Sequence, residues 1–344
     1  MKTKKNYNFF NKKNILVTGG TGSFGSFFVK TILKFSKPKR LVIFSRDEFK
    51  QSELKKELIN FPNNDCLRFF IGDVRNVDRL KFACRDIEIL IHAAALKQID
   101  TAEYNPFECI ETNIRGAENV VRASLSSSIK KVIAISTDKA VNPINLYGAS
   151  KLAADKVFIS ANQSARTQDA KFSVVRYGNV VASRGSAISL FLNLSKDKEK
   201  VINITDKNMT RFWISIYDAV HFVLSCCKIM VGGEIFIPKM PSMKTIDIAK
   251  ALAPLNKIKF SGKRPGEKIH EVLIPEDYSD YTYENNDGYV TFPDFIDTKR
   301  YKKVYKNLKK IKQLFRYDSL NNPSWIQKNK IKSFVITSIN KDII

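Results

Sequence analysis

The chain has 344 residues, a formal net charge of +24, and 44% hydrophobic and 27% charged residues. This composition is typical of a globular protein and excludes a disordered or fibrous chain. No stretch approaches the roughly 18 apolar residues that span a bilayer, so we expect no membrane-spanning helix. The Lys- and Asn-rich segment 1–14 lacks the apolar core of a signal peptide, so we expect no signal peptide.

The excess positive charge is concentrated near the two ends of the chain. Residues 1–13 contain five lysines and no acid, and residues 299–332 contain twelve Lys or Arg residues and one acid, Asp318. A nucleic-acid-binding protein more often carries a basic stripe with interleaved aromatic residues on its folded core. We therefore interpret the charge as solvated surface and expect no nucleic-acid partner, with attraction to a membrane surface or polyanion as the alternative.

The five cysteines form no Cys-x-x-Cys pair, and their number is odd. This usage predicts reduced thiols, a cytoplasmic location and no metal site.

Short apolar runs alternate with helical patterns through the first half of the chain. The expected buried strands are residues 14–18, 41–44, 67–71, 87–91, 131–135 and 172–176. After the first of them, apolar residues recur at the spacing of one helix face: Phe24, Phe28, Ile32 and Phe35. Repeated strand–helix units predict an α/β fold with a doubly wound parallel sheet, the Rossmann arrangement.

The alternation loosens after residue 184, where a smaller C-terminal substrate-binding lobe is expected. The predicted parts are a basic arm (1–13), an NADP-binding Rossmann domain (14–184, with a helix from 212–231 returning to it), the lobe (185–211 and 232–298) and a basic C-terminal segment (299–344). Residues 1–13 and the last dozen residues are expected to be frayed.

A glycine-rich loop, TGGTGSFG at 18–25, joins the first strand to the first helix. Gly19, Gly22 and Gly25 have the Gly-x-x-Gly-x-x-Gly spacing, which allows a tight turn and a close approach of a pyrophosphate to the helix N-terminus. The strand before it and the helix after it are the context that this motif requires. The motif predicts a dinucleotide site, whose loop contacts are Gly19, Thr21, Gly22, Ser23, Phe24 and Gly25.

The end of the second strand indicates which dinucleotide binds. NAD sites usually place Asp or Glu there, whereas this chain has Ser45 and Arg46, and a hydroxyl and a guanidinium suit a 2′-phosphate. The acid at Asp47 leaves NAD as the alternative to NADP. Asp73 and Val74, after the third strand, are expected near the adenine, although Asp73 could equally be a turn residue.

Small residues follow the fourth strand, and two pairs of candidate reaction groups follow the fifth. Small residues from Ala93 onward let a ribose or nicotinamide lie close to the backbone. Tyr147 and Lys151 share one helix face at i and i+4, and an ammonium beside a phenol lowers the pKa of the phenol. Asp138 and Lys139 follow the fifth strand directly.

These motifs resemble the extended short-chain dehydrogenase/reductases, and more narrowly the inverting UDP-N-acetylglucosamine 4,6-dehydratases (5-epimerases) of pseudaminic acid biosynthesis. The resemblance runs from Thr18 to about Glu271 and includes TGGTGSFG, HAAALKQ, STDKA, NPINLYGASKL, SRGS, MTRFW and RPGEKIHE. Lys139 stands where retaining dehydratases have Glu, and Tyr147 where capsule-type inverting enzymes tend to have Met. Ala182 replaces a usual Gly, and Asp100-Thr101 a common Pro-Ala, which puts the fine sugar preference in doubt.

The resemblance implies the reaction of UDP-N-acetylglucosamine to UDP-2-acetamido-2,6-dideoxy-β-L-arabino-hex-4-ulose. Tyr147, tuned by Lys151, would accept the C4 hydroxyl proton during oxidation at C4. Lys139 would remove the C5 proton, and Asp138 would protonate the departing C6 hydroxyl, before hydride returns to C6 and C5 is inverted. Lys151 and the nicotinamide would lower the pKa of Lys139 while Asp138 would raise it, and the sequence leaves that balance open.

The resemblance also implies further contacts and a homo-oligomer, a dimer or larger. The additional cofactor contacts are Thr112, Asn113 and Val180. The substrate contacts are Lys97, Asn179, Arg184, Gly185, Ser186, Thr205, Arg211, Arg264 and Glu267. Of these, Arg211 and Arg264 are suited to a pyrophosphate, because guanidinium groups form bidentate charge-assisted bonds.

Two other functions are open. One is a UDP-sugar 4-epimerase or a retaining dehydratase on the same scaffold, and Lys139 in place of Glu argues against the latter. The other is a redox-silent NADP-binding sensor or structural subunit, a class that typically loses the Tyr or Lys of the catalytic pair.

Overall fold

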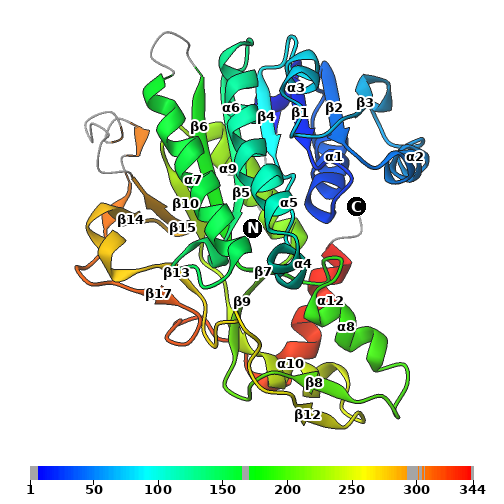
Figure 1. Ribbon diagram of the computed structural model, residues 1–344, viewed down its shortest axis with the longest axis vertical. Coiled ribbons are helices and arrows are strands. Elements are labelled where there is room, and N and C mark those ends of the chain that lie inside the picture. Colours follow the sequence, from blue (N-terminus) through cyan, green and yellow to red (C-terminus); the bar gives the residue numbers. More distant parts are fainter. Residues whose placement is uncertain (1–6, 165–169, 293–300, 302–303, 306, 342–344) are drawn as a thin grey trace.

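The computed structural model describes residues 7–164, 170–292, 301, 304–305 and 307–341. Its main sheet begins with six parallel strands in the spatial order β3-β2-β1-β4-β5-β6 (Figure 1). They are β1 (Asn14–Thr18), β2 (Arg40–Ser45), β3 (Leu67–Ile71), β4 (Ile89–His92), β5 (Lys131–Thr137) and β6 (Lys171–Tyr177). The chain order reverses beside β1, which is where this fold places a dinucleotide.

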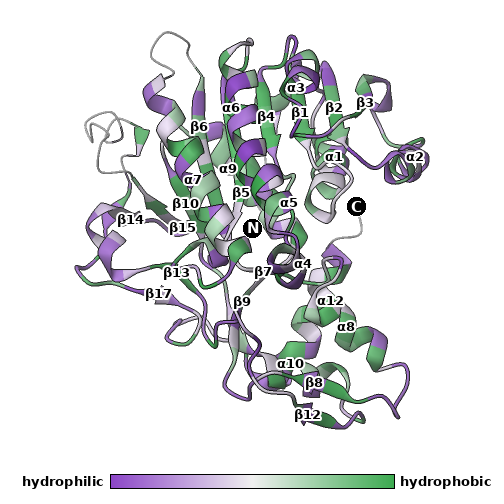
Figure 2. Ribbon diagram, viewed as in Figure 1, coloured by the Kyte–Doolittle hydropathy of each residue, from purple (hydrophilic) through white to green (hydrophobic). Residues whose placement is uncertain are grey.

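Helices cover both faces of this sheet. On one face α3 (Val77–Ala83) packs on α6 (Gly116–Leu125), which packs on α7 (Leu146–Ser164). On the other, α1 (Ser23–Phe35) packs on α9 (Ile216–Ile229). The central strands are hydrophobic along their length (Figure 2), as strands covered on both faces require. The predicted α/β, doubly wound fold is confirmed.

The sheet continues beyond β6 with strands from the C-terminal half. Strand β10 (Ile235–Pro238) pairs parallel with β6, and β15 (Gly288–Thr291), β14 (Thr282–Glu284) and β16 (Lys309–Lys310) follow antiparallel. Most of these strands fall in the range expected to form the lobe, 232–298, and they extend the main sheet instead.

A smaller lobe lies below the carboxyl ends of the parallel strands in Figure 1. It contains α8 (Ala187–Leu194), β8 (Ile202–Ile204), β12 (Ile258–Phe260), α10 (Thr245–Leu252) and α12 (Ile331–Lys341). These elements share a separate hydrophobic core that includes Phe191, Trp213, Ile248 and Val335. Two short helices after β4, α4 (Ile99–Tyr104) and α5 (Pro106–Ile110), pack against α7. Two small sheets consist of β7 (Asn179–Val180), β9 (Thr210–Ile214) and β11 (Ser242–Lys244), and of β13 (Val272–Ile274) and β17 (Tyr317–Asp318).

The expectation of frayed ends is wrong for the described residues of both ends. At the N-terminus, Tyr7 and Phe10 are buried in the main core, and the Tyr7 hydroxyl bonds to His221 on α9. At the other end, Ile331 and Val335 of α12 are buried against α10 in the lobe. Residues 1–6 and 342–344 lie outside the described residues. The high lysine content of both ends led to the prediction of frayed ends, although a few apolar residues in each end pack against the folded protein.

The segment from 212 to 230, expected to be helical throughout, begins as a strand. Phe212 and Trp213 belong to β9, which pairs with β11. The helix begins at Ile216, because the Ser215 hydroxyl caps it by accepting a hydrogen bond from the Asp218 N–H.

Candidate active site

A cleft of about 1010 Å³ opens at the carboxyl ends of the parallel strands. One wall comes from the loops after β1, β2, β4 and β5, and the other from β7, α8 and the segment 264–271. The cleft therefore lies between the main sheet and the lobe, at the point where the strand order reverses.

The glycine-rich loop forms the floor of the sheet side of the cleft. Gly19 has a φ of +64°, and a Cβ there would lie 2.8 Å from the backbone of Ala93. A Cβ at Gly25 would lie 2.4 Å from the Gly19 carbonyl oxygen. The hydroxyl of Thr112 lines the same cleft and is buried without a hydrogen-bond partner among the described residues. The backbone cradle and the free hydroxyl fit a nicotinamide dinucleotide.

The end of β2 brings cations to the outer end of the cleft. Ser45, Arg46 and Lys50 line it together. The Asp47 carboxylate accepts a hydrogen bond from the Lys50 N–H at 2.9 Å and pairs with Lys50 Nζ at 2.7 Å, and these bonds lower the pKa of Asp47. This acid is thus engaged as the cap of α2 (Glu48–Glu57).

Asp73 is likewise engaged by arginines. Its carboxylate lies 2.8 Å from Arg75 and 3.5 Å from Arg46. Burial favours a higher pKa for Asp73, but the bonds from Arg75 and the charge of Arg46 outweigh it and hold the pKa below the usual range. Val74 lies beside it on the cleft wall.

The Tyr147–Lys151 pair lies at the start of α7, on the cleft wall. Burial raises the pKa of Tyr147 to about 12, although Lys139 and a hydrogen bond with Thr137 oppose this rise. Lys151 donates to the Ile135 carbonyl at 2.8 Å, and burial lowers its pKa against the effect of Asp155. Burial of the phenol therefore decides the direction in this structure, and the expected lowering of the Tyr147 pKa by Lys151 stays a prediction.

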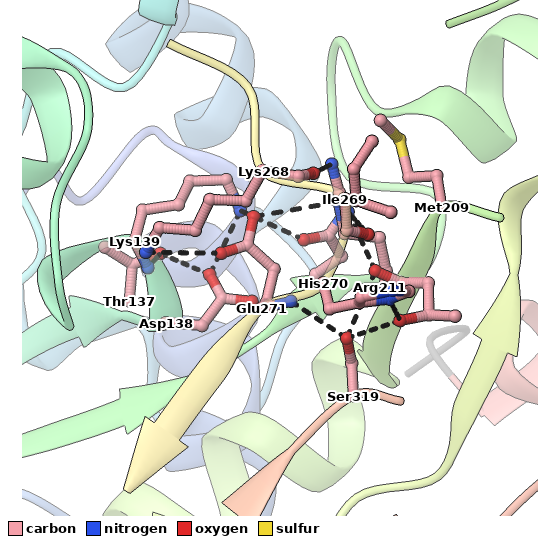
Figure 3. Close-up of polar contacts among 12 residues, drawn as sticks. Thr137, Asp138, Lys139, Met209, Arg211, Lys268, Ile269, His270, Glu271 and Ser319 are labelled. Atoms are coloured by element: carbon pink, nitrogen blue, oxygen red, sulfur yellow. Dashed lines mark hydrogen bonds and ion pairs between the residues drawn. The ribbon is translucent and has the colours of Figure 1, made fainter. Parts of the chain in front are cut away.

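Lys139 lies in the cleft among three oxygen acceptors. Its Nζ is 3.0 Å from Asp138 Oδ1 and 3.6 Å from Glu271 Oε1 (Figure 3). The third acceptor, Asn179 Oδ1, lies 3.3 Å away. Burial lowers the pKa of Lys139, but the Asp138 and Glu271 carboxylates outweigh burial and raise it above the usual range. The balance that the sequence left open is thus toward the ammonium form.

Glu271 joins this group to Arg211 and Lys268. The Glu271 carboxylate lies 3.7 Å from Arg211 Nε and 3.9 Å from Lys268 Nζ. Arg211 donates to the carbonyls of Thr210, Ile269 and Lys268. Arg211, expected to bind pyrophosphate, is therefore largely occupied with the backbone, while still lining the cleft.

The expected substrate contacts gather mostly on the lobe side. Those that line the cleft, besides Arg211, are Lys97, Asn179, Gly185, Ser186, Thr205, Arg264 and Glu267. At the mouth of the cleft, Arg264 lies 3.7 Å from Asp100, and both side chains are exposed. Lys97 donates to the Arg184 carbonyl at 3.2 Å. Val180, an expected cofactor contact on β7, also lines the cleft.

Three expected site residues do not line the cleft. Asn113 is buried and bonds to the Leu96 backbone and to Ser150, so it braces the loop after β4. Arg184 instead donates to the Thr21 carbonyl, which places it against the glycine-rich loop. Asp138 is fully buried behind Lys139, and its Oδ2 has no hydrogen-bond partner among the described residues.

Four residues at the site carry chemistry that the sequence did not assign to them. Thr137, whose hydroxyl donates to Asp138 Oδ1 at 3.0 Å and bonds to Tyr147, directly precedes the assigned pair. Lys50, one helical turn past Arg46, could have been found from the same 2′-phosphate argument. Glu271 and Lys268 lie about 130 positions from Lys139, and no local pattern connects them.

The sequence pattern of the polysaccharide biosynthesis protein family matches residues 15–292. The chain is 50% identical over 331 residues to the UDP-N-acetylglucosamine 4,6-dehydratase (inverting) of Campylobacter jejuni, covering 95% of this chain and 98% of that protein. It is 39% identical over 335 residues to the UDP-glucose 4-epimerase of Rickettsia conorii, covering 95% and 96%.

A solved structure resembles this one over nearly its whole length. It is the X-ray structure of Pen from Bacillus thuringiensis, with a TM-score of 0.88, 35% sequence identity, and coverage of 96% of this chain and 99% of that one. The similarity extends over both the sheet and the lobe, so it includes both walls of the cleft.

Proposed function

Because this chain belongs to the family of polysaccharide biosynthesis proteins, and because Tyr147 and Lys139 line one cleft, we propose that it is an inverting UDP-N-acetylglucosamine 4,6-dehydratase. It converts this substrate to UDP-2-acetamido-2,6-dideoxy-β-L-arabino-hex-4-ulose, which makes it a carbon–oxygen lyase. The observation that carries the proposal is the placement of the Lys139 amino group in the cleft, where a retaining enzyme has a glutamate.

The cofactor of this reaction is NADP. When bound, it accepts a hydride from C4 of the sugar and later returns it to C6. Ser45, Arg46 and Lys50 would hold its 2′-phosphate, at the end of the cleft where Asp47 is already engaged as a helix cap. A guanidinium and an ammonium there favour a phosphate over a bare ribose hydroxyl.

Tyr147 accepts the proton of the C4 hydroxyl in the first step. The charge of Lys139 stabilises the phenolate against the effect of burial. Because the product keeps the ketone at C4, Tyr147 does not return this proton to the sugar and loses it to solvent before the next turnover.

Lys139 and Asp138 divide the elimination step. Lys139, the only one of the two that lines the cleft, removes the C5 proton that the 4-keto group acidifies. Asp138 lies behind it and contacts Thr137 at 3.0 Å, so a proton from Asp138 reaches the C6 oxygen through Lys139 or Thr137. After elimination, C5 receives a proton on the opposite face, which inverts its configuration.

A UDP-sugar 4-epimerase is the second candidate, since the Rickettsia conorii relative carries that name. Tyr147 and Lys151 would serve the oxidation at C4 in either enzyme. An epimerase needs no base at C5, however, and the Lys139 cluster would then have no role.

The remaining proposals concern the pathway, the cellular location and the oligomeric state of the enzyme. The product enters pseudaminic acid synthesis, and the enzyme works in the cytoplasm as a homo-oligomer without a nucleic-acid partner. The buried, unpaired thiols of all five cysteines support a reducing compartment. Among the described residues, no helix is long and apolar enough to cross a membrane. Sedimentation of the purified protein tests the oligomer.

The proposed function is tested by incubating the purified protein with UDP-N-acetylglucosamine and following keto-sugar formation and NADPH absorbance together. We expect the keto-sugar to accumulate without net formation of NADPH. Formation of UDP-N-acetylgalactosamine alone would favour the epimerase, and no conversion would favour the redox-silent class.

A further inference from the structure

Glu271 lies where the substrate-side segment 264–271 meets the reaction centre. It directly precedes β13, and only 2% of its surface is exposed. Three cations surround its carboxylate: Lys139 at 3.6 Å, Arg211 at 3.7 Å and Lys268 at 3.9 Å (Figure 3). The charges of these cations offset the hydration that the carboxylate loses on burial.

The surroundings of Glu271 hold it firmly in place. Its backbone N–H donates to the Ser319 hydroxyl at 2.9 Å, and the Ser319 N–H donates to the Glu271 carbonyl at 2.8 Å. Arg211 ties the preceding backbone by donating to the Ile269 and Lys268 carbonyls. One carboxylate oxygen, Oε2, is buried without a hydrogen-bond partner among the described residues, so the group is not fully satisfied by the fold.

Glu271 completes the surroundings of the Lys139 amino group. An ammonium has three hydrogens to donate, and three acceptors face it: Asp138, Asn179 and Glu271. Asp138 is the adjacent residue in the chain, and Asn179 lies on β7. Glu271 connects Lys139 to the segment that also carries Arg264 and Glu267.

We propose that Glu271 is a positioning residue for the C5 step: its carboxylate holds the Lys139 amino group against segment 264–271 and keeps a proton on it between turnovers. This inference rests on the proposed function. Lys139 first gives its proton to solvent and enters the step as the free amine, which takes the C5 proton. The electrons of the C5–H bond pass into the enolate of the 4-keto sugar, and the ammonium that forms is the state paired with Glu271.

The test is Glu271→Gln, which keeps the size of the side chain and removes its charge. Loss of a negative charge beside an ammonium lowers the pKa of that ammonium. The acid limb of the pH profile for C5 exchange in D₂O should therefore shift by about one pH unit, to lower pH. The maximal rate should fall at the same time, because the amino group is no longer held. If Glu271 had only a structural role, Glu271→Gln would lower the rate of C5 exchange without shifting the acid limb of its pH profile.

Other titratable groups near Lys139 and Glu271 are unchanged in this variant, so a shift reports on Glu271. These groups are Asp138, Tyr147, Arg211, Lys268 and His270. Glu271→Asp, which keeps the charge, should leave the limb within about half a pH unit of the parent. Glu276→Gln is the matched control. It removes the same negative charge, but from an exposed ion pair with Arg316.

A second readout needs no substrate. In protein labelled with ¹³C at lysine Cε, the signal that disappears in Lys139→Met reports the titration of Lys139. We expect its midpoint to be lower in Glu271→Gln than in the parent and in Glu276→Gln. A keto-sugar from the parent together with coincident midpoints would overturn this inference alone. No keto-sugar from the parent would overturn the proposed function, and this inference with it.

Discussion

Two buried charge clusters lie at the carboxyl ends of neighbouring strands, and they differ in how completely they are satisfied. Asp155 and Arg176 form an ion pair at 2.8 Å, and the Ser136 hydroxyl donates to the same carboxylate at 2.9 Å. In the Lys139 cluster, by contrast, Asp138 Oδ2 and Glu271 Oε2 are buried without hydrogen-bond partners among the described residues.

From this difference we infer that the Asp155–Arg176 cluster stabilises the fold, whereas the Lys139 cluster serves the reaction. Buried polar atoms nearly always have a hydrogen-bond partner, so two carboxylate oxygens without one in the described residues around one ammonium mark a place where another group is to be accommodated. The Asp155–Arg176 pair joins α7 to β6 and fixes the helix that carries Tyr147 and Lys151. The predictions below test this division, beginning with the largest expected effect.

Breaking the satisfied pair should cost the most stability. Asp155→Ala leaves the Arg176 guanidinium buried without its partner, and we expect the free energy of unfolding to fall by about 3–5 kcal/mol. Urea unfolding followed by circular dichroism measures this. Glu276→Ala, which breaks the exposed pair with Arg316, should cost less than about 1 kcal/mol. Similar losses in the two variants would show that the Asp155 pair is not a structural anchor.

Removing the amino group of the unsatisfied cluster should affect chemistry far more than folding. Lys139→Ala should lower the rate of C5 deuterium exchange by on the order of 10²-fold or more, the usual scale for a general base. Lys263→Ala, at an exposed position just before segment 264–271, is the control and should retain the exchange rate. Exchange that survives the Lys139 change, measured by NMR in D₂O, would reject Lys139 as the base.

A third, exposed set of charges at the end of β2 should contribute to binding and little to stability. Arg46 is half-exposed and lies 3.5 Å from Asp73. Arg46→Ala should lose about 1–3 kcal/mol of NADP affinity, the size of a charged hydrogen bond, with NAD affinity nearly unchanged. Isothermal titration calorimetry tests this, with Arg85→Ala as a distant control. Equal affinity of the parent protein for NADP and NAD would contradict the assignment.

The smallest effect concerns backbone strain beside the cleft. Ala182 has a φ of +52°, a conformation that costs a residue with a Cβ about 1–2 kcal/mol and glycine almost nothing. Since glycine also gains entropy in the unfolded chain, Ala182→Gly should raise the free energy of unfolding by no more than about 1 kcal/mol. Ala251→Gly, within α10, should instead lower it by about 1 kcal/mol. A loss of stability in Ala182→Gly would show that the strain is not real.

The fold could be predicted from the sequence because its determinants are local. The glycine-rich loop, the buried strands and the Tyr147–Lys151 spacing each lie within a short window. The parts that were missed depend on contacts between distant segments. Glu271 meets Lys139 only because β13 brings it beside the end of β5, and Tyr7 docks on α9 across most of the chain. The Lys139 pKa likewise depends on a carboxylate that no spacing rule connects to it.

The Ala182 position shows the opposite case, in which a departure from the family pattern could be read in advance. The resemblance marked it as a usual glycine, and the structure gives the physical reason, a positive φ. The other departure, Asp100, forms the pair with Arg264 at the mouth of the cleft. Both residues lie on the substrate side of the cleft, where local sequence patterns predict the fewest contacts.

The central claim, that the unsatisfied cluster inverts C5 during 4,6-dehydration, is tested most directly by NMR of the product formed from UDP-N-acetylglucosamine. In D₂O the account predicts a 4-keto-6-deoxy sugar of L-arabino configuration with one solvent deuterium at C5. In a parallel reaction in H₂O, deuterium placed at C4 of the substrate should appear at C6. A product that retains the C5 configuration, or one changed only at C4, would contradict the account.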